Sequence, residues 1–459
     1  MRPRNQAARD QLKTVLARRS AASAADLAER LGVSIPTLHR LLQEVGAEVV
    51  ATGRARRTRY ALRRPLRGDP AELPLYEVDA TGRAERVAHL ALVHPQGSCM
   101  DLAAAGWPVP EDSRDGWWGG LPYPLHDMRP QGYMGRQFAR AEHRQLAVPA
   151  NPEAWSDDDV VHVLSRSGAD LSGNLILGDP AYEQWLRGKL APPEPLKAQD
   201  LGAAYAALAE QAIAAGVPGS SAAGEFPKFA ALRDLPGSAT PHVLVKFSGA
   251  DGSPTVRRWA DLLVSEHLAL ECAAALPSIE SARSRIVTHA GRTFLEVERF
   301  DRHGPFGRSR LSSLGTLDAA LLGDGSADWV RLAGRLGSAG LLAPADLERV
   351  QHLWWFGRLI ANTDMHTGNL SFRPQGGLAL APAYDMVPML YAPLPGGEVP
   401  TRDFEPPLPL PPQRAVWAQA CQAALAFWMQ AAQDARISTE FRAACEGNAR
   451  RLETVAQHV

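Results

Sequence analysis

Three side chains in the last third of the chain have the types and the spacing that phosphoryl transfer requires. Asp364 and Asn369 are five positions apart in IANTDMHTGNLSF, residues 360–372, and Asp385 follows Asn369 by sixteen positions. The reaction needs a carboxylate that orients the attacking hydroxyl and receives its proton, and oxygen ligands for Mg²⁺ on the phosphates. We predict that Asp364 is this base and that Asn369 and Asp385 are the metal ligands.

Each of these residues also has a plainer interpretation. Asp364 could cap a helix, Asn369 could stand in a turn, and Asp385 could be a loop carboxylate. His366 lies in the same loop. A single histidine without partners at fixed spacing is, however, a weak sign of the metal site of a hydrolase.

A lysine inside an apolar run indicates the other half of a nucleotide site. Lys246 lies in HVLVKFS, and Glu266 follows twenty positions later in WADLLVSEHLALECAAAL. A buried ammonium needs an anionic partner, and a strand lysine paired with a helix glutamate orders the phosphates of ATP in kinases. The alternative places Lys246 on an edge strand with its amine in water and Glu266 on a solvated helix face. Because the chain has only five lysines, we favour the paired arrangement.

The elements that position these residues follow from the hydrophobic pattern. The strand-like runs HVLVKFS, SRIVTHA and RTFLEVERF surround the helical run between about 241 and 300, and helical patterns dominate from about 315, interrupted by a polar segment at 362–385. Residues 81–200 are expected to be rich in β-structure with some helices, and the Pro- and Arg-rich residues 65–80 are expected to be a linker. The acidic residues 157–159 are most simply a helix start favoured by the helix dipole. The expected fold class is α+β.

The net charge of −1 is the sum of a basic N-terminal segment, residues 1–67 (the head), and an acidic remainder. Residues 1–67 hold 15 Lys or Arg and 5 Asp or Glu, so the remaining residues hold 34 and 45 of the chain's 49 and 50. Residues 8–65 are predicted to form three short helices and a hairpin. Ser23 and Ser34 can cap the second and third helices, which stop at Gly32 and Gly46.

This head resembles a winged helix-turn-helix domain that binds double-stranded DNA. The third helix would present polar side chains to the major groove, and the wing would place arginines against phosphates or a minor groove. The alternative is a common helical triplet with solvated surface arginines. The expected DNA-contacting residues are Ser34, Thr37, His39 and Arg40 in the helix and Arg54, Arg56, Arg57 and Arg59 in the wing.

Other features of the sequence indicate the cellular compartment in which the protein is expected. No run of eighteen apolar residues predicts a transmembrane helix, and the N-terminus lacks the apolar core of a signal peptide. The four cysteines are far apart and form no CxxC pair. We therefore expect no membrane partner and a reducing, cytoplasmic environment.

Seven segments together resemble the HipA-like serine/threonine kinases of bacterial toxin–antitoxin systems. They are GADLSGNLI (168–176), SAAGEFPK (221–228), VLVKF (243–247), SEH (265–267), VERFDR (297–302), RLIANTDMHTGNLSF (358–372) and AYDMVP (383–388). The helix-turn-helix in front resembles the YjjJ-type branch of this family. The resemblance implies a two-lobed, protein-kinase-like body with a mixed β N-lobe and an all-helical C-lobe.

The resemblance also implies roles for individual residues. Asp364 matches the catalytic aspartate, Asn369 and Asp385 match the magnesium ligands, and Lys246 matches the lysine that holds the phosphates of ATP. The backbone of Glu298 and Phe300 would meet the adenine, and Asp301 the ribose. The phosphate loop is represented by Ser221, Gly224 and Lys228, with Ser221 or the adjacent Ser220 as the site of autophosphorylation.

These inferences predict four segments: a winged helix-turn-helix (1–67), a β-rich subdomain (68–160), a kinase N-lobe (161–310) and a helical C-lobe (311–459). The expected activity is ATP- and Mg²⁺-dependent phosphorylation of a protein, in the family a component of the translation machinery. A homodimer is compatible with a winged-helix reader of palindromes.

Two alternatives remain open. One is a DNA-binding transcription regulator whose kinase-like body senses nucleotide without phosphorylating proteins. The other, a small-molecule kinase of the aminoglycoside-phosphotransferase kind, explains neither VERFDR nor the head.

Overall fold

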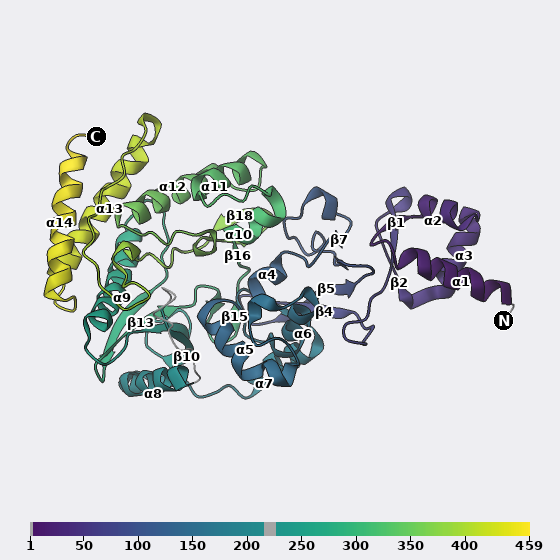
Figure 1. The fold of residues 1–459 in the computed structure, drawn as a ribbon, viewed down its shortest axis with the longest axis horizontal. Coiled ribbons are helices and arrows are strands. Elements are labelled where there is room, and N and C mark those ends of the chain that lie inside the picture. The colour runs from purple at the N-terminus through teal and green to yellow at the C-terminus, as the bar shows by residue number, and fades with distance from the viewer. Residues whose placement is uncertain (1–2, 215–225) are drawn as a thin grey trace. The chain divides into compact units, whose positions relative to one another are not determined.

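The computed structural model describes residues 3–214 and 226–459, which form two compact units (Figure 1). The first unit comprises residues 1–78, 83–129 and 154–190, and the second comprises 79–82, 130–153 and 191–459. Ser220, Ser221 and Gly224 lie outside the described residues. In the described part of the chain, no helix is long and apolar enough to span a membrane.

The first unit begins with the three predicted helices and a three-stranded sheet. The helices are α1 (Pro3–Leu16), α2 (Ala24–Leu31) and α3 (Ile35–Val45), and the strands are β1 (Ala22–Ser23), β2 (Val49–Thr52) and β3 (Arg59–Leu62). The strand order is β1-β3-β2, and all pairs are antiparallel.

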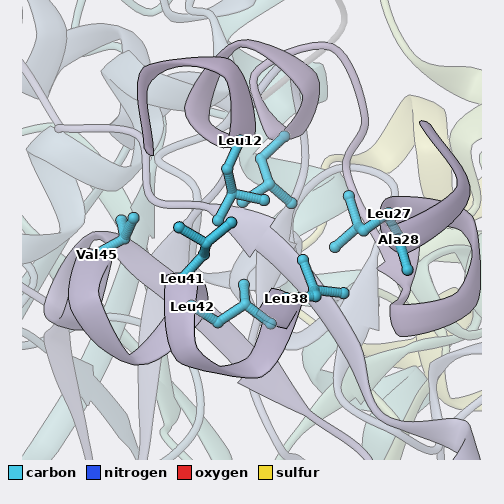
Figure 2. Packing of buried hydrophobic residues seen from close by; sticks show 9 residues of the cluster. Leu12, Leu27, Ala28, Leu38, Leu41, Leu42 and Val45 are labelled. Carbon is cyan, nitrogen blue, oxygen red and sulfur yellow. The ribbon is translucent and has the colours of Figure 1, made fainter. Parts of the chain in front are cut away.

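The ends of these helices confirm the predicted caps. Ser23 and Ser34 accept backbone N–H groups at the starts of α2 and α3, and Gly32 ends α2 in the left-handed region at φ 62°. Leucines at helical spacing converge between the helices: Figure 2 shows Leu12, Leu27, Leu38, Leu41 and Leu42 packed together with Ala28 and Val45. The predicted hairpin turns near Gly53, whose φ of 99° and close approach to the Arg57 carbonyl exclude a side chain.

The rest of the first unit is a five-stranded sheet with helices. Its strand order is β7-β6-β5-β4-β8. The elements are β4 (Leu73–Val78), β5 (Ala84–Leu92), β6 (Ser98–Cys99), β7 (Trp117–Trp118), β8 (Leu175–Leu177), α4 (Pro124–Met128), α6 (Asp157–Ser167) and α7 (Asp179–Leu190). The interpretation of residues 65–80 as a linker was wrong for 73–78, because β4 pairs with β5 and β8 and its Leu75 and Val78 are fully buried.

The N-terminal lobe of the second unit, residues 191–310, contains a mixed sheet of order β12-β13-β11-β10-β9. Only the β9–β10 pair is parallel. The elements are α8 (Leu201–Ala214), β9 (Leu196–Lys197), β10 (Lys228–Asp234), β11 (His242–Phe247), α9 (Pro254–Ala273), β12 (Ser284–His289), β13 (Arg292–Glu298), β14 (Arg302–His303) and β15 (Gly307–Arg308). Outside this range, α5 (Gly132–Leu146) also belongs to the second unit.

This sheet has two chemically different faces. Val243, Val245 and Phe247 of β11 pack against α8 through Tyr205 and neighbouring residues. Because side chains alternate along a strand, Lys246 points to the opposite face, where it meets α9. The alternation of β11 therefore explains how a lysine is placed inside an apolar run.

The C-terminal lobe, residues 311–459, is mostly helical. Its helices are α10 (Leu314–Leu317), α11 (Trp329–Ser338), α12 (Pro344–Leu359), α13 (Arg414–Gln433) and α14 (Thr439–Ala456). The expectation of an all-helical lobe was wrong. This lobe also contains a small antiparallel sheet of three short strands, β16 (Ser312–Ser313), β17 (Ser371–Pro374) and β18 (Leu378–Leu380). Strands β17 and β18 form because the polar segment 362–385 turns back on itself after Asn369.

Candidate active site

The site is built around Lys246 of β11, whose side chain contacts α9 and the loop that carries Asp385. The Nζ of Lys246 donates to both carboxylate oxygens of Glu266 on α9, at 2.7 and 2.8 Å, and also contacts Oδ1 of Asp385. Lys246 is 8% exposed and Glu266 is 1% exposed, so this ion pair is shielded from water. The structure thus confirms the predicted Lys246–Glu266 pairing and brings Asp385, 139 positions from Lys246, to the same ammonium.

Mutual electrostatics fix the ionisation of these groups. Burial alone would lower the pKa of Lys246, but the Asp385 and Glu266 carboxylates outweigh it and raise the pKa above its ordinary value. Burial alone would raise the pKa of Asp385, but Lys246 and Lys228 hold it at about 2. Burial raises the pKa of Glu266 despite the opposing effect of Lys246. At neutral pH, Asp385 is therefore an anion and Lys246 is a cation.

Lys228 lies directly opposite Lys246 in the β10–β11 register. Residues in such a pair project from the same face of the sheet, so two ammonium groups flank the Asp385 carboxylate. The ring of Phe226, just before Lys228, lies 5.7 Å from Nζ of Lys246 and packs edge-on against Trp259 of α9. Two adjacent cations in a partly shielded site suit a polyanionic ligand such as a triphosphate.

The loop after α12 is held by two asparagines. The amide oxygen of Asn362 accepts the backbone N–H of Asp364 at 3.0 Å, and its Nδ2 donates to the Asp385 carbonyl at 3.3 Å. Asn369 donates from Nδ2 to the Asp364 carbonyl at 2.8 Å. Asp364 itself is exposed. The two amides hold the backbone of this loop and leave the Asp364 carboxylate accessible to a substrate.

Asn362 is a site residue that the sequence reasoning missed, although it lies within the segment IANTDMHTGNLSF. Its preceding residue, Ala361, and its partner Asp385 both have positive φ, at 59° and 55°. Such values are uncommon for residues with a Cβ and are maintained by surrounding structure. The hydrogen bond of Asn362 to the Asp385 carbonyl is one such support.

The arrangement fits a divalent metal that takes its remaining ligands from phosphates. Asn369 donates through Nδ2 to the Asp364 carbonyl, so its amide oxygen is directed away from that carbonyl. The pKa of Asp385 is low, so its carboxylate is ionised and can supply an anionic oxygen ligand. Among the described residues, no group of three or more His, Cys, Asp or Glu could hold a metal. The oxygen donors that are present favour Mg²⁺ over a soft metal.

The residues predicted to bind adenosine lie after β13. The Glu298 carboxylate accepts from Arg233 at 2.8 Å, and its backbone N–H donates to the Arg283 carbonyl. The Phe300 ring is 5.5 Å from the ring of Tyr384, the residue before Asp385. Asp301 is buried and ion-paired with Arg299 and Arg302 at 3.0 and 2.8 Å, which gives its carboxylate a structural role in addition to the predicted ribose contact.

Arg233 organises the strand that leads to these residues, and the sequence reasoning missed it. Its guanidinium is 1% exposed and bonds Glu296, Glu298 and the Thr240 carbonyl. Tyr205 also donates to Glu296, at 2.7 Å. No local signal could identify this network, because both carboxylate partners, Glu296 and Glu298, lie more than 60 positions from Arg233.

In the head, the predicted DNA-contacting residues divide into two groups. His39 and Arg40 are exposed on α3, whereas Ser34 and Thr37 bond one another at its N-terminus, 2.9 Å between hydroxyls. Arg54, Arg57 and Arg59 are exposed around the hairpin, and the side chain of the fourth predicted arginine, Arg56, lies outside the described part of the structure. Among the described residues, none of these three arginines has an ion-pair partner.

Five other basic residues of the head are paired. Arg9 bonds Glu44, Lys13 bonds Glu48, and Arg63 bonds Glu72. Arg64 and Arg67 pair with Asp158 and Asp159 at the start of α6. Ser156 caps this helix, which confirms the interpretation of the acidic run as a helix start. Exposed arginines without an ion-pair partner among the described residues therefore lie on the hairpin and on α3, and also at Arg18, Arg19 and Arg30 near the ends of α1 and α2.

A sheet-containing lobe and a mainly helical lobe joined at a Lys–Glu–Asp cluster, beside an Asp–Asn loop, define a kinase-like domain of the HipA type. A family model described as "HipA-like C-terminal domain" matches residues 220–456, and one described as "YjjJ-like toxin, middle domain" matches residues 69–186. The chain belongs to the YjjJ-like toxins of the HipA-like kinase family.

One curated relative supports this placement, and one solved structure shares the fold. The chain is 37% identical to Toxin YjjJ of Escherichia coli (strain K12) over 423 residues, which cover 92% of each protein. Its fold is similar to a chain in a solved complex of Shewanella oneidensis MR-1 HipA, HipB and operator DNA, with a TM-score of 0.50 and 14% identity over 84% of this chain and 97% of that one.

A Helicobacter pylori proinflammatory kinase, CtkA, gives a TM-score of 0.34 at 11% identity, over 50% of this chain and 88% of that one.

Proposed function

We propose that the protein is an ATP- and Mg²⁺-dependent serine/threonine protein kinase that binds DNA through its own head. The observation that carries the kinase assignment is the convergence of Lys246, Glu266 and Asp385, with Asp364 exposed on a loop tied to Asp385 through Asn362. A purely structural ion pair would not require the accompanying exposed carboxylate or the second cation, Lys228.

The proposed mechanism assigns one task to each residue. Asp364 accepts a hydrogen bond from the Ser or Thr hydroxyl of the substrate and receives its proton as the oxygen attacks the γ-phosphorus in line. Lys246, held by Glu266, binds phosphate oxygens, and Lys228 adds a second positive charge. Asn369 and Asp385 would hold Mg²⁺, which when bound neutralises charge on the phosphates.

The remaining nucleotide contacts are carried over from the family resemblance. Glu298 and Phe300 would meet the adenine through their backbone, and Asp301 the ribose. The hydrogen bond from the Glu298 N–H to Arg283 leaves its carbonyl as the group offered to the base. Ser221 and Gly224 would complete the phosphate loop, with Ser221 or Ser220 as the autophosphorylated residue.

The head supports DNA binding because the hairpin of its helix-turn-helix carries Arg54, Arg57 and Arg59, which are exposed and have no ion-pair partner among the described residues. Phosphate contacts from such arginines provide affinity, and His39 and Arg40 on α3 are placed for base contacts. The Shewanella HipA complex contains HipB and operator DNA. In the present chain, we propose that the fused head serves this DNA-binding role.

The kinase assignment is tested with labelled ATP, Mg²⁺ and phosphosite mapping on the full chain. Wild type is expected to transfer phosphate to itself or to a protein, and Asp364→Ala to lose at least about 100-fold in rate, since it removes the base. Asp112→Ala, which changes an exposed aspartate of the first unit, serves as the matched control.

Equal label in wild type and Asp364→Ala would sink the kinase proposal. Nucleotide binding without any transfer would instead favour the nucleotide-sensing regulator. Label mapped to Ser220 rather than Ser221 would move the autophosphorylation site by one residue.

A further inference from the structure

An arginine without an acidic partner is fixed beside the catalytic loop. Arg358 lies in the last turn of α12 and is exposed. Its guanidinium carbon is 5.8 Å from the ring centroid of Trp354 and 5.3 Å from that of Trp355. Within the part of the chain that the structure describes, it forms no ion pair or hydrogen bond through this group.

Side-chain contacts connect the helix that carries Arg358 to the loop that carries Asp364. The Trp354 ring lies 5.9 Å from the Trp329 ring, and Nε1 of Trp329 donates to the His366 carbonyl at 3.2 Å. Gly357, next to Arg358, is covered by Met365, whose Cε would be 2.6 Å from a Cβ added at that glycine. The last turn of α12 therefore packs directly on Met365, and Trp354 is linked to His366 through Trp329 of α11.

Nearby arginines of the same lobe are neutralised. Arg331 and Arg335 both pair with Asp324, and Arg349 pairs with Asp346. A positive charge at a helix C-terminus and its stacking on tryptophan each stabilise the helix modestly. Neither effect uses the N–H donors at the edge of the Arg358 guanidinium, which are shaped to bind a carboxylate.

We propose that Arg358, on its tryptophan platform, binds a carboxylate of an acidic segment that flanks the phosphorylated Ser or Thr of the protein substrate. This inference rests on the proposed kinase function and specifies its substrate class. Residues 68–459 carry a net negative charge, which repels an acidic peptide in general. Arg358 provides a local positive charge that attracts such a peptide beside the loop that carries Asp364. Tryptophan and arginine are also the residue types that dominate binding at protein interfaces.

The test uses peptide arrays with a central Ser or Thr and each amino acid fixed in turn at the flanking positions, incubated with the full chain, labelled ATP and Mg²⁺. Wild type is expected to prefer Asp or Glu over Lys at one or more positions by about three- to fivefold, the upper part of the range for an exposed ion pair. Arg358→Gln should abolish this preference, and Arg358→Glu should reverse it in favour of Lys. A reversal cannot arise from loss of folding.

Arg450→Gln, which alters an exposed arginine of α14, is the control and should retain the wild-type preference. Wild-type labelling without acidic selection, or selection unchanged in Arg358→Gln, would overturn this inference and leave the kinase proposal intact. Failure of wild type to label any peptide or protein would contradict the kinase proposal itself, and this inference with it.

Discussion

The side chain of Lys246 contacts both lobes of the second unit. It extends from β11 to Glu266 on α9 and to Asp385, which follows β18 of the C-terminal lobe. Removing one partner of a buried ion pair leaves the other charge without compensation. The same contacts that prepare the site for phosphates therefore also affect the stability of the fold.

We expect Lys246→Met to destabilise the protein by about 3 kcal/mol at pH 7, with the effect shrinking as the pH falls. In the wild type, the pKa of Asp385 is about 2, below its ordinary value of 3.8. Its contribution to stability is therefore fully present above pH 4 and is lost as the pH falls through about 2. In the variant, Asp385 and Glu266 bind protons at higher pH, so acid relieves the buried negative charge.

The measurement is urea unfolding of wild type and variant at several pH values between 4 and 7. Lys13→Met, which breaks an exposed pair with Glu48, is the control and should cost little at any pH. A destabilisation by Lys246→Met that stays constant across this range would contradict the electrostatic account.

At the scale of elements, two acidic residues of α9 fix this helix to other parts of the second unit. Glu266 engages Lys246, and Asp261, five positions earlier, accepts both the N–H and the hydroxyl of Ser438 at 2.7 and 2.6 Å. Ser438 is the N-cap of α14, so the helix that carries Glu266 is tied to the C-terminal helices. Figure 1 shows α9 beside the α13–α14 pair.

Asp261→Ala should lower the free energy of unfolding by about 3 kcal/mol, because it leaves two donors of Ser438 without their buried acceptor. Ser438→Ala removes only the hydroxyl and should cost about 1 kcal/mol. Chemical denaturation of both variants provides the comparison. Similar losses in the two would show that the backbone bond to Asp261 contributes nothing of its own.

Elements whose signals are local were predictable, and those defined by distant partners were not. The caps Ser23 and Ser34 and the strand β11 follow from neighbouring residues. The two-residue strand β16 has no periodicity of its own and exists only because it pairs with β17, almost sixty positions later. For the same reason, the motif around Asp364 was visible in the sequence, whereas the support of Glu298 by Arg233 was not.

At the scale of the whole molecule, the head is integrated into the first unit rather than appended to it. Val50 and Ala61 pack with Ala91, Val93 and Trp117, and Arg64 pairs with Asp158. Deleting residues 1–67 would expose this apolar cluster. Substitutions on the hairpin therefore test DNA binding more cleanly than a truncation.

Replacing Arg54, Arg57 and Arg59 together by Ala should weaken DNA binding and reduce the slope of log affinity against log salt by about 3, since each arginine neutralises about one phosphate. Phosphoryl transfer should be unchanged, because these side chains are exposed and the described structure gives them no ion-pair partner. The measurement is fluorescence anisotropy with duplex DNA at several salt concentrations, together with the labelled-ATP assay. The charge-matched control replaces Arg83, Arg86 and Arg187, which are exposed elsewhere on the first unit. An equal loss of affinity in this control would assign DNA binding to overall charge and remove the hairpin from the proposed interface.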